Sequence, residues 1–362
     1  MSDLIIEHGL GLGRRNAAGL LVLDRPAAQN ALSIEMRARI AVAFPRWARD
    51  PGIYGVVSRS TVPRAFCVGG DIREMSALMR SDPIASRKGL ADELRLCWLH
   101  ECFSKPTVSL IDGAVMGTGV GISLYGTHRV AGAGYRFAMP EVRLGYFPDC
   151  AVCHPLSRLP SSIGYYLALT GRASGRADAF HLGLVTHCID ATCFEPIEAH
   201  IADADPVDPI LDSLHRDPGP SPIAAEARRI ETYFSEPTLA AMLRRLASPK
   251  PPDAAWASAV LADIGRASPL ALCVTERAIR RAAALDLHET FMQDYRLAWR
   301  FVDEPDVQEG VRTVLVEKTG TPRWQHSRPE DVEETRIAAF FATLGPDELA
   351  LPTRQQMQSA RV

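Results

Sequence analysis

A strand-like run, a glycine-rich turn and a helical stretch follow one another twice in the first part of the chain. The run at residues 53–58 leads to Gly69-Gly70, after which a helical stretch begins. The run at residues 107–111 leads to the turn Gly117-Thr118-Gly119-Val120-Gly121. Glycine lets the backbone approach a bound group closely, and the free N–H groups at the start of a helix attract anions. Two such units could therefore direct two backbone N–H groups to one point.

Two acidic residues follow the second unit, and each comes directly after a proline. Glu141 follows Pro140 at the end of a strand-like run at residues 135–139, and Asp149 follows Pro148. Donors that can hold an oxyanion, followed by acids that can move a proton or attack, suggest acyl chemistry. Taken singly, Glu141 could equally be an exposed loop glutamate and Asp149 a helix-capping or turn aspartate.

The composition is that of a soluble globular chain. Its 362 residues are 47% hydrophobic and 23% charged, which suits one large domain or two of ordinary size. A net charge of −3 gives no general electrostatic case for a nucleic acid or an anionic membrane as partner. No apolar run approaches the roughly 20 residues that span a bilayer, and no export signal is visible at the first residues. We expect a cytoplasmic protein without nucleic-acid or membrane partners.

The eight cysteines raise the question of redox or metal chemistry. A long chain with a large core does not need disulfides, and a reducing compartment favours free thiols. Cys150-Ala-Val-Cys153-His154 could be a redox pair or half of a zinc site. A second half at residues 187–193 lies at a spacing that matches no common zinc pattern. We therefore favour buried or inert thiols and predict no metal.

The strand and turn patterns of the first 204 residues predict a mixed α/β region. Strands at residues 4–7 and 18–23, separated by a glycine-rich turn at residues 9–13, suggest a hairpin. Polar residues dominate the segment 76–92, which is expected to be a mobile loop.

From about residue 205 the pattern becomes helical. Residues 217–222 form a proline-rich break, and no convincing strand follows for roughly ninety residues. A last apolar-faced helix is expected at residues 336–344. Helix starts along the whole chain carry capping signals, namely Ser33, Ser268 before Pro269, and Asp286 with Glu289.

A series of short motifs resembles the crotonase superfamily, the enoyl-CoA hydratase/isomerase group, and within it most of all the 3-hydroxyisobutyryl-CoA hydrolases. The motifs are, in chain order, Arg25-Pro26, Asn30-Ala31-Leu32, Ala65-Phe66-Cys67, Gly69-Gly70-Asp71-Ile72, Met139-Pro140-Glu141, Gly145, Phe147-Pro148-Asp149, Leu169-Thr170-Gly171, Ser268-Pro269, Tyr295-Arg296-Leu297, Glu309-Gly310-Val311-Arg312, Lys318, Pro322 and Trp324. Each motif is weak by itself, but their order and spacing are specific.

The resemblance implies an α/β fold in which ββα units are wound into a spiral. The spiral core with its acyl-CoA site would occupy residues 1–204, and a mostly helical C-terminal region at residues 205–362 would cover it. A homo-oligomer is possible. No cofactor is expected, because coenzyme A is part of the substrate.

In this family the substrate is an acyl-CoA thioester whose carbonyl oxygen is held by two backbone N–H groups, which map to Gly70 and Thr118. The family usually has glycine where Thr118 stands, so the β-branched side chain is expected to crowd the site. An arginine is expected to bind the 3′-phosphate, since the family's lysine near Ala27 is missing and only four residues are lysine. The residues expected to hold CoA or substrate are Ala27, Ala28, Asn30, Val68, Gly69, Asp71, Ile72 and Gly117.

The resemblance also assigns the chemistry. Glu141 matches a catalytic glutamate of the family, and Asp149 occupies a position typical of the hydrolase branch. Hydratases use a second glutamate, and the matching residue here is Gly121, which argues against hydration. The expected reaction is hydrolysis of 3-hydroxyisobutyryl-CoA to 3-hydroxyisobutyrate and CoA, a step of valine catabolism. Glu141 would attack the thioester or activate a water, and Asp149 would position the substrate's 3-hydroxyl or the water.

Other functions remain open from the sequence. One is an enoyl-CoA hydratase or isomerase that acts on another acyl-CoA. A second is a non-catalytic CoA-binding paralogue, which Thr118 and the missing lysine motivate. A third is dinucleotide binding at Gly117-x-Gly119-x-Gly121, although the third glycine of that motif comes one residue early, with Ile122 in its place.

Overall fold

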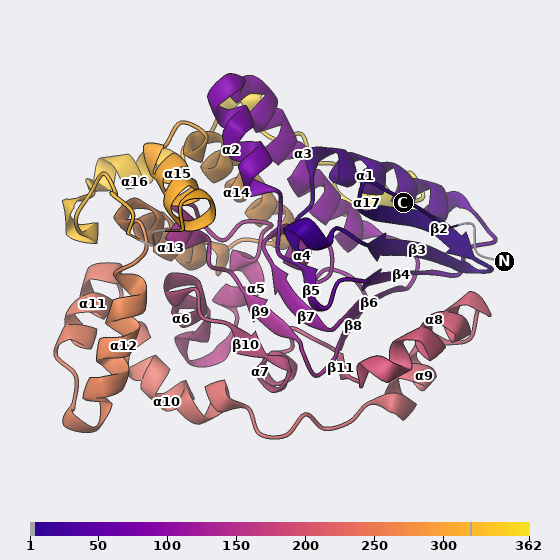
Figure 1. Ribbon diagram of the computed structural model, residues 1–362. Helices are drawn as coiled ribbons and strands as arrows, with labels where there is room; N and C mark the ends of the chain where they lie inside the picture. Colours follow the sequence, from indigo (N-terminus) through magenta and orange to yellow (C-terminus); the bar gives the residue numbers. More distant parts are fainter. Residues whose placement is uncertain (1–3, 319–320) are drawn as a thin grey trace.

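Two sheets form the centre of the molecule. The computed structural model describes residues 4–318 and 321–362. Within them, helices surround a larger and a smaller sheet (Figure 1). The larger sheet has the strand order β1 (Ile5–Glu7), β2 (Leu10–Arg15), β3 (Ala18–Leu23), β4 (Gly55–Ser60), β6 (Thr107–Ile111), β8 (His128–Ala131) and β11 (His187–Cys188). The smaller sheet has the order β10 (Ser174–Gly175), β9 (Arg136–Ala138), β7 (Gly113–Met116) and β5 (Arg64–Cys67).

From β4 onward the chain alternates between the two sheets. β4 joins the larger sheet and β5 the smaller one, and the pairs β6–β7 and β8–β9 repeat this step with parallel neighbours. Helices α2 (Ile72–Ser81) and α3 (Pro83–Cys102) complete the first of these turns, and α4 (Thr118–Gly121) completes the second. This winding confirms the predicted crotonase-like spiral of ββα units.

Helices cover both faces of the larger sheet. Successive side chains of a strand point to opposite faces, so the buried residues of β3 divide into two sets. Leu21 and Leu23 pack in the core that also holds α1 (Ile34–Arg49). Leu20 and Val22 pack in a second core with α8 (Phe194–Ala202) and α9 (Val207–Leu214). The continuous apolar run of β3 is therefore explained by burial on both sides.

The prediction for the first strands is wrong in one respect. Most of the glycine-rich segment 9–13 belongs to β2, which pairs with both β1 and β3 in an antiparallel meander. The chain reverses at His8 and Gly9, whose φ angles are 50° and 79°. A two-residue turn is enough there, so the glycines that follow are free to be strand residues.

The segment 76–92 is helical, so the prediction of a mobile loop is wrong. α2 continues to Ser81, and α3 starts at Pro83 after a single break at Asp82. The Asp82 side chain accepts a hydrogen bond from the Ala85 N–H at 2.9 Å and so caps α3. The sequence suggested a loop because polar and small residues are frequent in this stretch, but several of them are buried in α3.

No strand follows β11 in residues 189–318 and 321–362, and this range includes the roughly ninety residues after the break at 217–222 for which none was predicted. Ser268 and the Asp286–Glu289 pair cap α13 and α14 as expected, and the last predicted helix is α16. The helices between β9 and the C-terminus are α5 (Cys153–Ser157), α6 (Ile163–Thr170), α7 (Arg176–His181), α8, α9, α10 (Pro222–Phe234), α11 (Leu239–Ala247), α12 (Ala254–Ile264), α13 (Pro269–Ala282), α14 (Leu287–Phe301), α15 (Pro305–Gly310), α16 (Glu334–Phe340) and α17 (Arg354–Ser359).

The end of the chain returns to its first half. α17 lies beside α1 and α3 (Figure 1), the Trp98 indole N–H donates to the Pro352 carbonyl at 2.7 Å, and Arg354 pairs with Glu101. These contacts fasten α3 to the C-terminal end of the chain.

Among the described residues no single helix is long and apolar enough to cross a membrane, while one pair, α13 with the helical segment 251–264, meets the length and composition criteria together but is bent by 107°.

Candidate active site

The two glycine turns meet because β5 and β7 are parallel neighbours in the smaller sheet. A Cβ added to Gly69 would lie 3.6 Å from the Gly117 Cα and 3.7 Å from the Thr118 nitrogen. Both glycines have positive φ angles, 113° and 47°, which side-chain-bearing residues rarely adopt. Among the described residues, neither Gly70 nor Thr118 donates its N–H to a protein acceptor. The predicted oxyanion donors therefore lie next to each other on the wall of one cavity.

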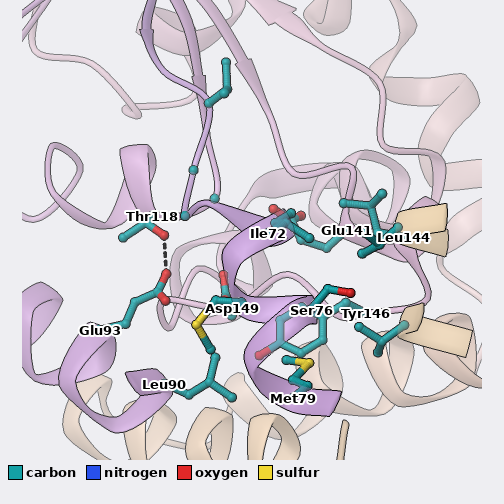
Figure 2. A pocket seen from close by; sticks show the side chains of 17 residues that line it. Ile72, Ser76, Met79, Leu90, Glu93, Thr118, Glu141, Leu144, Tyr146 and Asp149 are labelled. Atoms are coloured by element: carbon teal, nitrogen blue, oxygen red, sulfur yellow. Dashed lines mark hydrogen bonds between the residues drawn. The ribbon is translucent and has the colours of Figure 1, made fainter. Parts of the chain in front are cut away.

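The lining of that cavity is mostly apolar. α2, α3 and the C-terminal residues Val307 and Val311 supply much of its wall, and Figure 2 shows its polar groups, which include Glu93, Thr118, Glu141, Tyr146 and Asp149. The whole lining is Val68, Gly69, Gly70, Ile72, Met75, Ser76, Met79, Leu90, Glu93, Gly117, Thr118, Glu141, Leu144, Tyr146, Asp149, Val307 and Val311.

Glu141 is the first residue of a short 3-10 helix that directly follows β9 and Pro140. Its side chain is buried, and Oε2 has no hydrogen-bond partner among the described residues. A Cβ added to Gly117 would lie 3.4 Å from Glu141 Oε1, so the carboxyl sits against the glycine turn. Burial raises the pKa of Glu141 well above its usual range, and the nearby charge of Asp149 adds to the rise.

Asp149 is half-buried in the same cavity, eight residues further along the chain. Burial raises its pKa to about 6, and the charge of Arg37 opposes the rise. The structure thus brings Gly70, Thr118, Glu141 and Asp149 around one space, as the sequence predicted.

The Thr118 side chain turns toward Glu93 and does not point freely into the cavity. Its hydroxyl donates to Glu93 Oε1, and Arg37 pairs with Glu93 Oε2 (Figure 2 shows the first bond). The expected crowding is present, since a Cβ on Gly70 would lie only 3.2 Å from Thr118 Oγ1. The sequence analysis did not single out Glu93. The available signal was a charged residue on the same helical face as Leu90 and Cys97, in the middle of an apolar pattern.

Tyr146 was also missed. Its ring packs against Phe147 and Phe301, and its buried hydroxyl has no partner among the described residues. Burial and the charge of Asp149 raise its pKa well above the usual range, so the hydroxyl keeps its proton and can donate. No local pattern in the sequence marked this residue.

The residues expected to bind CoA fall into two groups. Val68, Gly69, Ile72 and Gly117 line the cavity. Ala27, Ala28, Asn30 and Asp71 do not line it.

The side chains of Asn30 and Asp71 have structural partners. Asn30 accepts from the Arg25 N–H at 2.7 Å and donates to the Phe66 carbonyl at 2.9 Å, and Asp71 pairs with Arg25 at 2.8 Å. A contact of these residues or of Ala27 and Ala28 with CoA stays a prediction.

One group near the site could in principle hold a cation. Ligand atoms of Glu93, Asp149 and Cys150 lie within 4.8 Å of one another. The group fits a metal poorly, because Arg37 and Thr118 already occupy both oxygens of Glu93 and because the pKa of the buried Cys150 thiol is raised well above its usual range. All eight cysteines lie in the described residues and are free, and Cys193 is the one that is not fully buried.

We expect activity to fall on acidification at an unusually high pH. A carboxyl with a raised pKa takes up its proton at a higher pH, so any step that needs the charged form is lost as pH falls through the raised value. The acid limb of kcat/KM is therefore expected at pH 6 or above, where an unperturbed carboxyl would place it near 4. Rates measured from pH 5 to 8 test this. If Asp149 dominates the limb, Asp149→Asn shifts it, and a rate that is still undiminished at pH 5 would contradict the prediction.

Comparison with known proteins places the chain in a family. A family profile described as enoyl-CoA hydratase/isomerase matches residues 18–341. The chain is 34% identical to "3-hydroxyisobutyryl-CoA hydrolase, mitochondrial" of Rattus norvegicus over 349 residues, which cover 93% of this chain and 90% of that protein. It is 31% identical over 372 residues to "3-hydroxyisobutyryl-CoA hydrolase 1" of Arabidopsis thaliana, which covers 98% and 96%. The cytoplasmic location expected from the sequence gains no support from relatives that are named as mitochondrial.

Solved structures agree on the fold. A crystal structure of an enoyl-CoA hydratase from Rhodobacter sphaeroides 2.4.1 is 32% identical, covers 95% of this chain and 100% of that one, and superposes with a TM-score of 0.89. A carnitinyl-CoA dehydratase from Mycobacterium thermoresistibile is also 32% identical and gives a TM-score of 0.88 with 95% and 99% covered. The chain therefore belongs to the enoyl-CoA hydratase/isomerase family, has the crotonase fold, and is an enzyme of the family's hydrolase type.

Proposed function

We propose that the protein hydrolyses a short-chain acyl-CoA thioester, most specifically 3-hydroxyisobutyryl-CoA, and releases 3-hydroxyisobutyrate and CoA, the reaction used in valine catabolism. The observation that carries the proposal is the Glu141 carboxyl, which is buried, has an unpartnered Oε2, and lies beside the turn that holds Thr118. The names of the relatives from rat and Arabidopsis support the same substrate.

The thioester carbonyl oxygen would lie between the N–H groups of Gly70 and Thr118. As the carbonyl carbon is attacked, negative charge develops on this oxygen, and the two donors stabilise it. Losing one such donor typically costs about 10²–10³ in rate. Both donors are backbone groups, so the Thr118 side chain does not prevent the second from acting.

Glu141 can act in two ways. In the first, its carboxylate attacks the carbonyl carbon, the C–S bond breaks, and CoA leaves as the thiolate. Water then opens the resulting mixed anhydride, which frees the acid and restores Glu141. In the second, Glu141 takes a proton from a water whose oxygen attacks the carbonyl directly, and that proton passes to the departing sulfur. The same cavity suits both forms.

The surroundings of Gly121 favour hydrolysis over hydration. A syn hydration needs water held between two carboxylates, and Gly121 matches the position of the second glutamate in hydratases. A Cβ added there would lie 2.4 Å from Cys97 Sγ and 3.1 Å from the Cys150 Cβ, which leaves no room for a longer side chain. Glu93 is a poor substitute because its oxygens are engaged by Arg37 and Thr118.

A hydroxyl on the acyl group would fit the polar end of the cavity. Tyr146 offers a free donor there and Asp149 an acceptor, while Met75, Met79 and Leu90 supply apolar wall for a branched carbon chain. A buried donor without a partner is costly, so a ligand oxygen that fills this place is favoured.

Release of free CoA thiol from a panel of acyl-CoAs tests the proposal. We expect the fastest release from 3-hydroxyisobutyryl-CoA, slower release from isobutyryl-CoA, and little change of crotonyl-CoA. Loss of the enoyl absorbance of crotonyl-CoA without thiol release would instead show a hydratase. Binding of CoA in a thermal-shift titration with no turnover would show a non-catalytic paralogue, and stabilisation by NAD(P) but not by CoA would favour the dinucleotide reading.

Replacing Tyr146 with phenylalanine is expected to lower kcat/KM for 3-hydroxyisobutyryl-CoA about 5-fold, because one hydrogen bond to the substrate hydroxyl is worth on the order of 1 kcal/mol. The ring and its packing on Phe301 are retained. Isobutyryl-CoA, which lacks the hydroxyl, serves as the control and is expected to react at an unchanged rate. An equal loss on both substrates would contradict the assigned contact.

A further inference from the structure

We infer that Asp294, on α14 of the helical C-terminal region, is a positioning residue that fixes the direction of Asp149 by holding the peptide unit between Cys150 and Ala151. The inference rests on the proposed function insofar as Asp149 is placed in the catalytic site, but its main test below is structural and does not depend on the substrate.

The turn after Asp149 has an unusual backbone. Cys150 and Ala151 follow it directly and have φ angles of 58° and 56°. Neither is glycine, and two successive left-handed residues with a Cβ cost free energy that the surrounding structure must offset. Rotation of the peptide unit between them would change only φ of Ala151 and ψ of Cys150, so φ of Cys150 would stay positive. The strain is released only if the whole turn rearranges.

Two side chains hold this one peptide unit from its opposite edges. The Tyr125 hydroxyl donates to the Cys150 carbonyl oxygen at 2.5 Å. The Ala151 N–H donates to Asp294 Oδ2 at 2.6 Å. The carbonyl and the N–H belong to the same peptide plane, so a flip of that plane would break both bonds at once. Tyr125 and Asp294 lie 169 residues apart in the chain, and only the tertiary fold brings them to this turn.

Among the described residues, the Ala151 N–H is the one hydrogen-bond partner of the Asp294 side chain. Its side chain is fully buried, and Oδ1 has no hydrogen-bond partner among the described residues. Burial raises its pKa well above the usual range, which favours a neutral carboxyl whose oxygen accepts from Ala151 without bringing a second negative charge near Asp149. An asparagine would present the same acceptor.

Holding this turn affects the site because Asp149 is part of the turn. Asp149 immediately precedes the held peptide, and its own carbonyl accepts from the Val152 N–H at 3.2 Å across the turn. Asp149 is therefore the first residue of the held turn, and a turn that rearranges to release its two left-handed residues would carry the Asp149 carboxyl out of the cavity. The C-terminal region thereby affects the site through Asp294, in addition to lining it with Val307 and Val311.

The test compares Asp294→Ala, Asp294→Asn and the double variant Asp294→Ala/Ala151→Gly, with Ala151→Gly alone as the reference for the double variant. We expect Asp294→Ala to lower kcat about 10²-fold with little change in KM, because a small displacement of an acting group has that effect. Asp294→Asn is expected to stay within about threefold of the wild type. The added glycine is expected to restore at least 10-fold, because glycine adopts the left-handed conformation without strain.

Asp178→Ala is the matched control for the loss of a buried aspartate. Asp178 accepts from the Ile223 N–H at 2.9 Å and does not line the cavity, so its removal is expected to lower Tm and leave kcat unchanged. Equal losses of kcat in Asp294→Asn and Asp294→Ala, or no rescue by the glycine, would overturn the inference.

A crystal structure of Asp294→Ala gives a readout that is independent of the substrate. We expect the turn at residues 149–152 to be rearranged and the Asp149 carboxyl to have left the cavity. An unchanged turn in that structure would overturn the inference whatever the activity. A wild type that releases no thiol from any acyl-CoA would instead overturn the proposed function and leave the structural readout in force. If Asp294→Ala does not fold, Asp294→Leu gives the same comparison with the volume filled.

Discussion

Replacing Glu141 with glutamine is expected to lower kcat about 10²–10⁴-fold, the usual contribution of a positioned acid or base, while CoA binds almost as before. Glutamine has the same shape, and Oε2 of Glu141 has no partner among the described residues, so the amide breaks no hydrogen bond there. The amide can neither attack the thioester nor take a proton from water. Thiol-release rates give kcat, and calorimetric titration with CoA gives the affinity.

The matching control is Glu276→Gln. Glu276 is also a buried glutamate, but it lies on α13, pairs with Arg280 and does not line the cavity, so its replacement is expected to leave kcat unchanged. Near-normal turnover of Glu141→Gln would refute the role given to Glu141. A loss of turnover that comes with a loss of CoA binding would assign it to the architecture of the site instead.

The parts of the site that the sequence revealed are those set by short stretches of chain. Gly70 and Thr118 each end a strand-to-helix turn, and strands β5 and β7 place the two turns side by side because they are parallel neighbours. Glu141 lies three residues after the end of β9, and Asp149 lies eleven residues after it. Strand, turn and proline signals are local, so pattern reading could find these residues.

The parts that the sequence did not reveal depend on contacts between distant helices. Glu93 meets Arg37 from 56 residues away, and Asp294 meets Ala151 from 143 residues away. A single charged residue inside an apolar helical face is visible in a sequence, but its partner is not. The prediction of a loop at residues 76–92 was wrong for a related reason. Ser86 and Gly89 of this stretch are buried against neighbours that only the fold supplies, so composition suggested a loop.

The predicted boundary between the two parts of the chain lies at residue 204. The structure shows that residues on both sides of it build one cavity, since Val307 and Val311 line it together with the glycine turns. The division of the chain into residues 1–204 and 205–362 stays a prediction.

Replacing Arg37 with methionine is expected to lower the free energy of unfolding by about 3–5 kcal/mol, the typical cost of leaving one member of a buried ion pair without its partner. Arg37 and Glu93 are 3% and 5% exposed, so water cannot replace the lost cation. Methionine keeps an apolar stem and removes the guanidinium, one nitrogen of which lies 3.5 Å from Met75 Sδ, so the loss reports mainly the charged group. Urea unfolding followed by circular dichroism measures the change.

The double variant Arg37→Met/Glu93→Gln separates the charge from the packing. Glutamine removes the unpaired negative charge and still accepts the hydrogen bond from the Thr118 hydroxyl, so the double variant is expected to recover most of the stability. If single and double variants were equally unstable, the packing of the arginine stem, and not the buried charge, would hold α1 to α3. The single variant is also expected to lose turnover, because Glu93 freed from Arg37 can turn into the cavity beside Thr118 and place a negative charge where the oxyanion has to form.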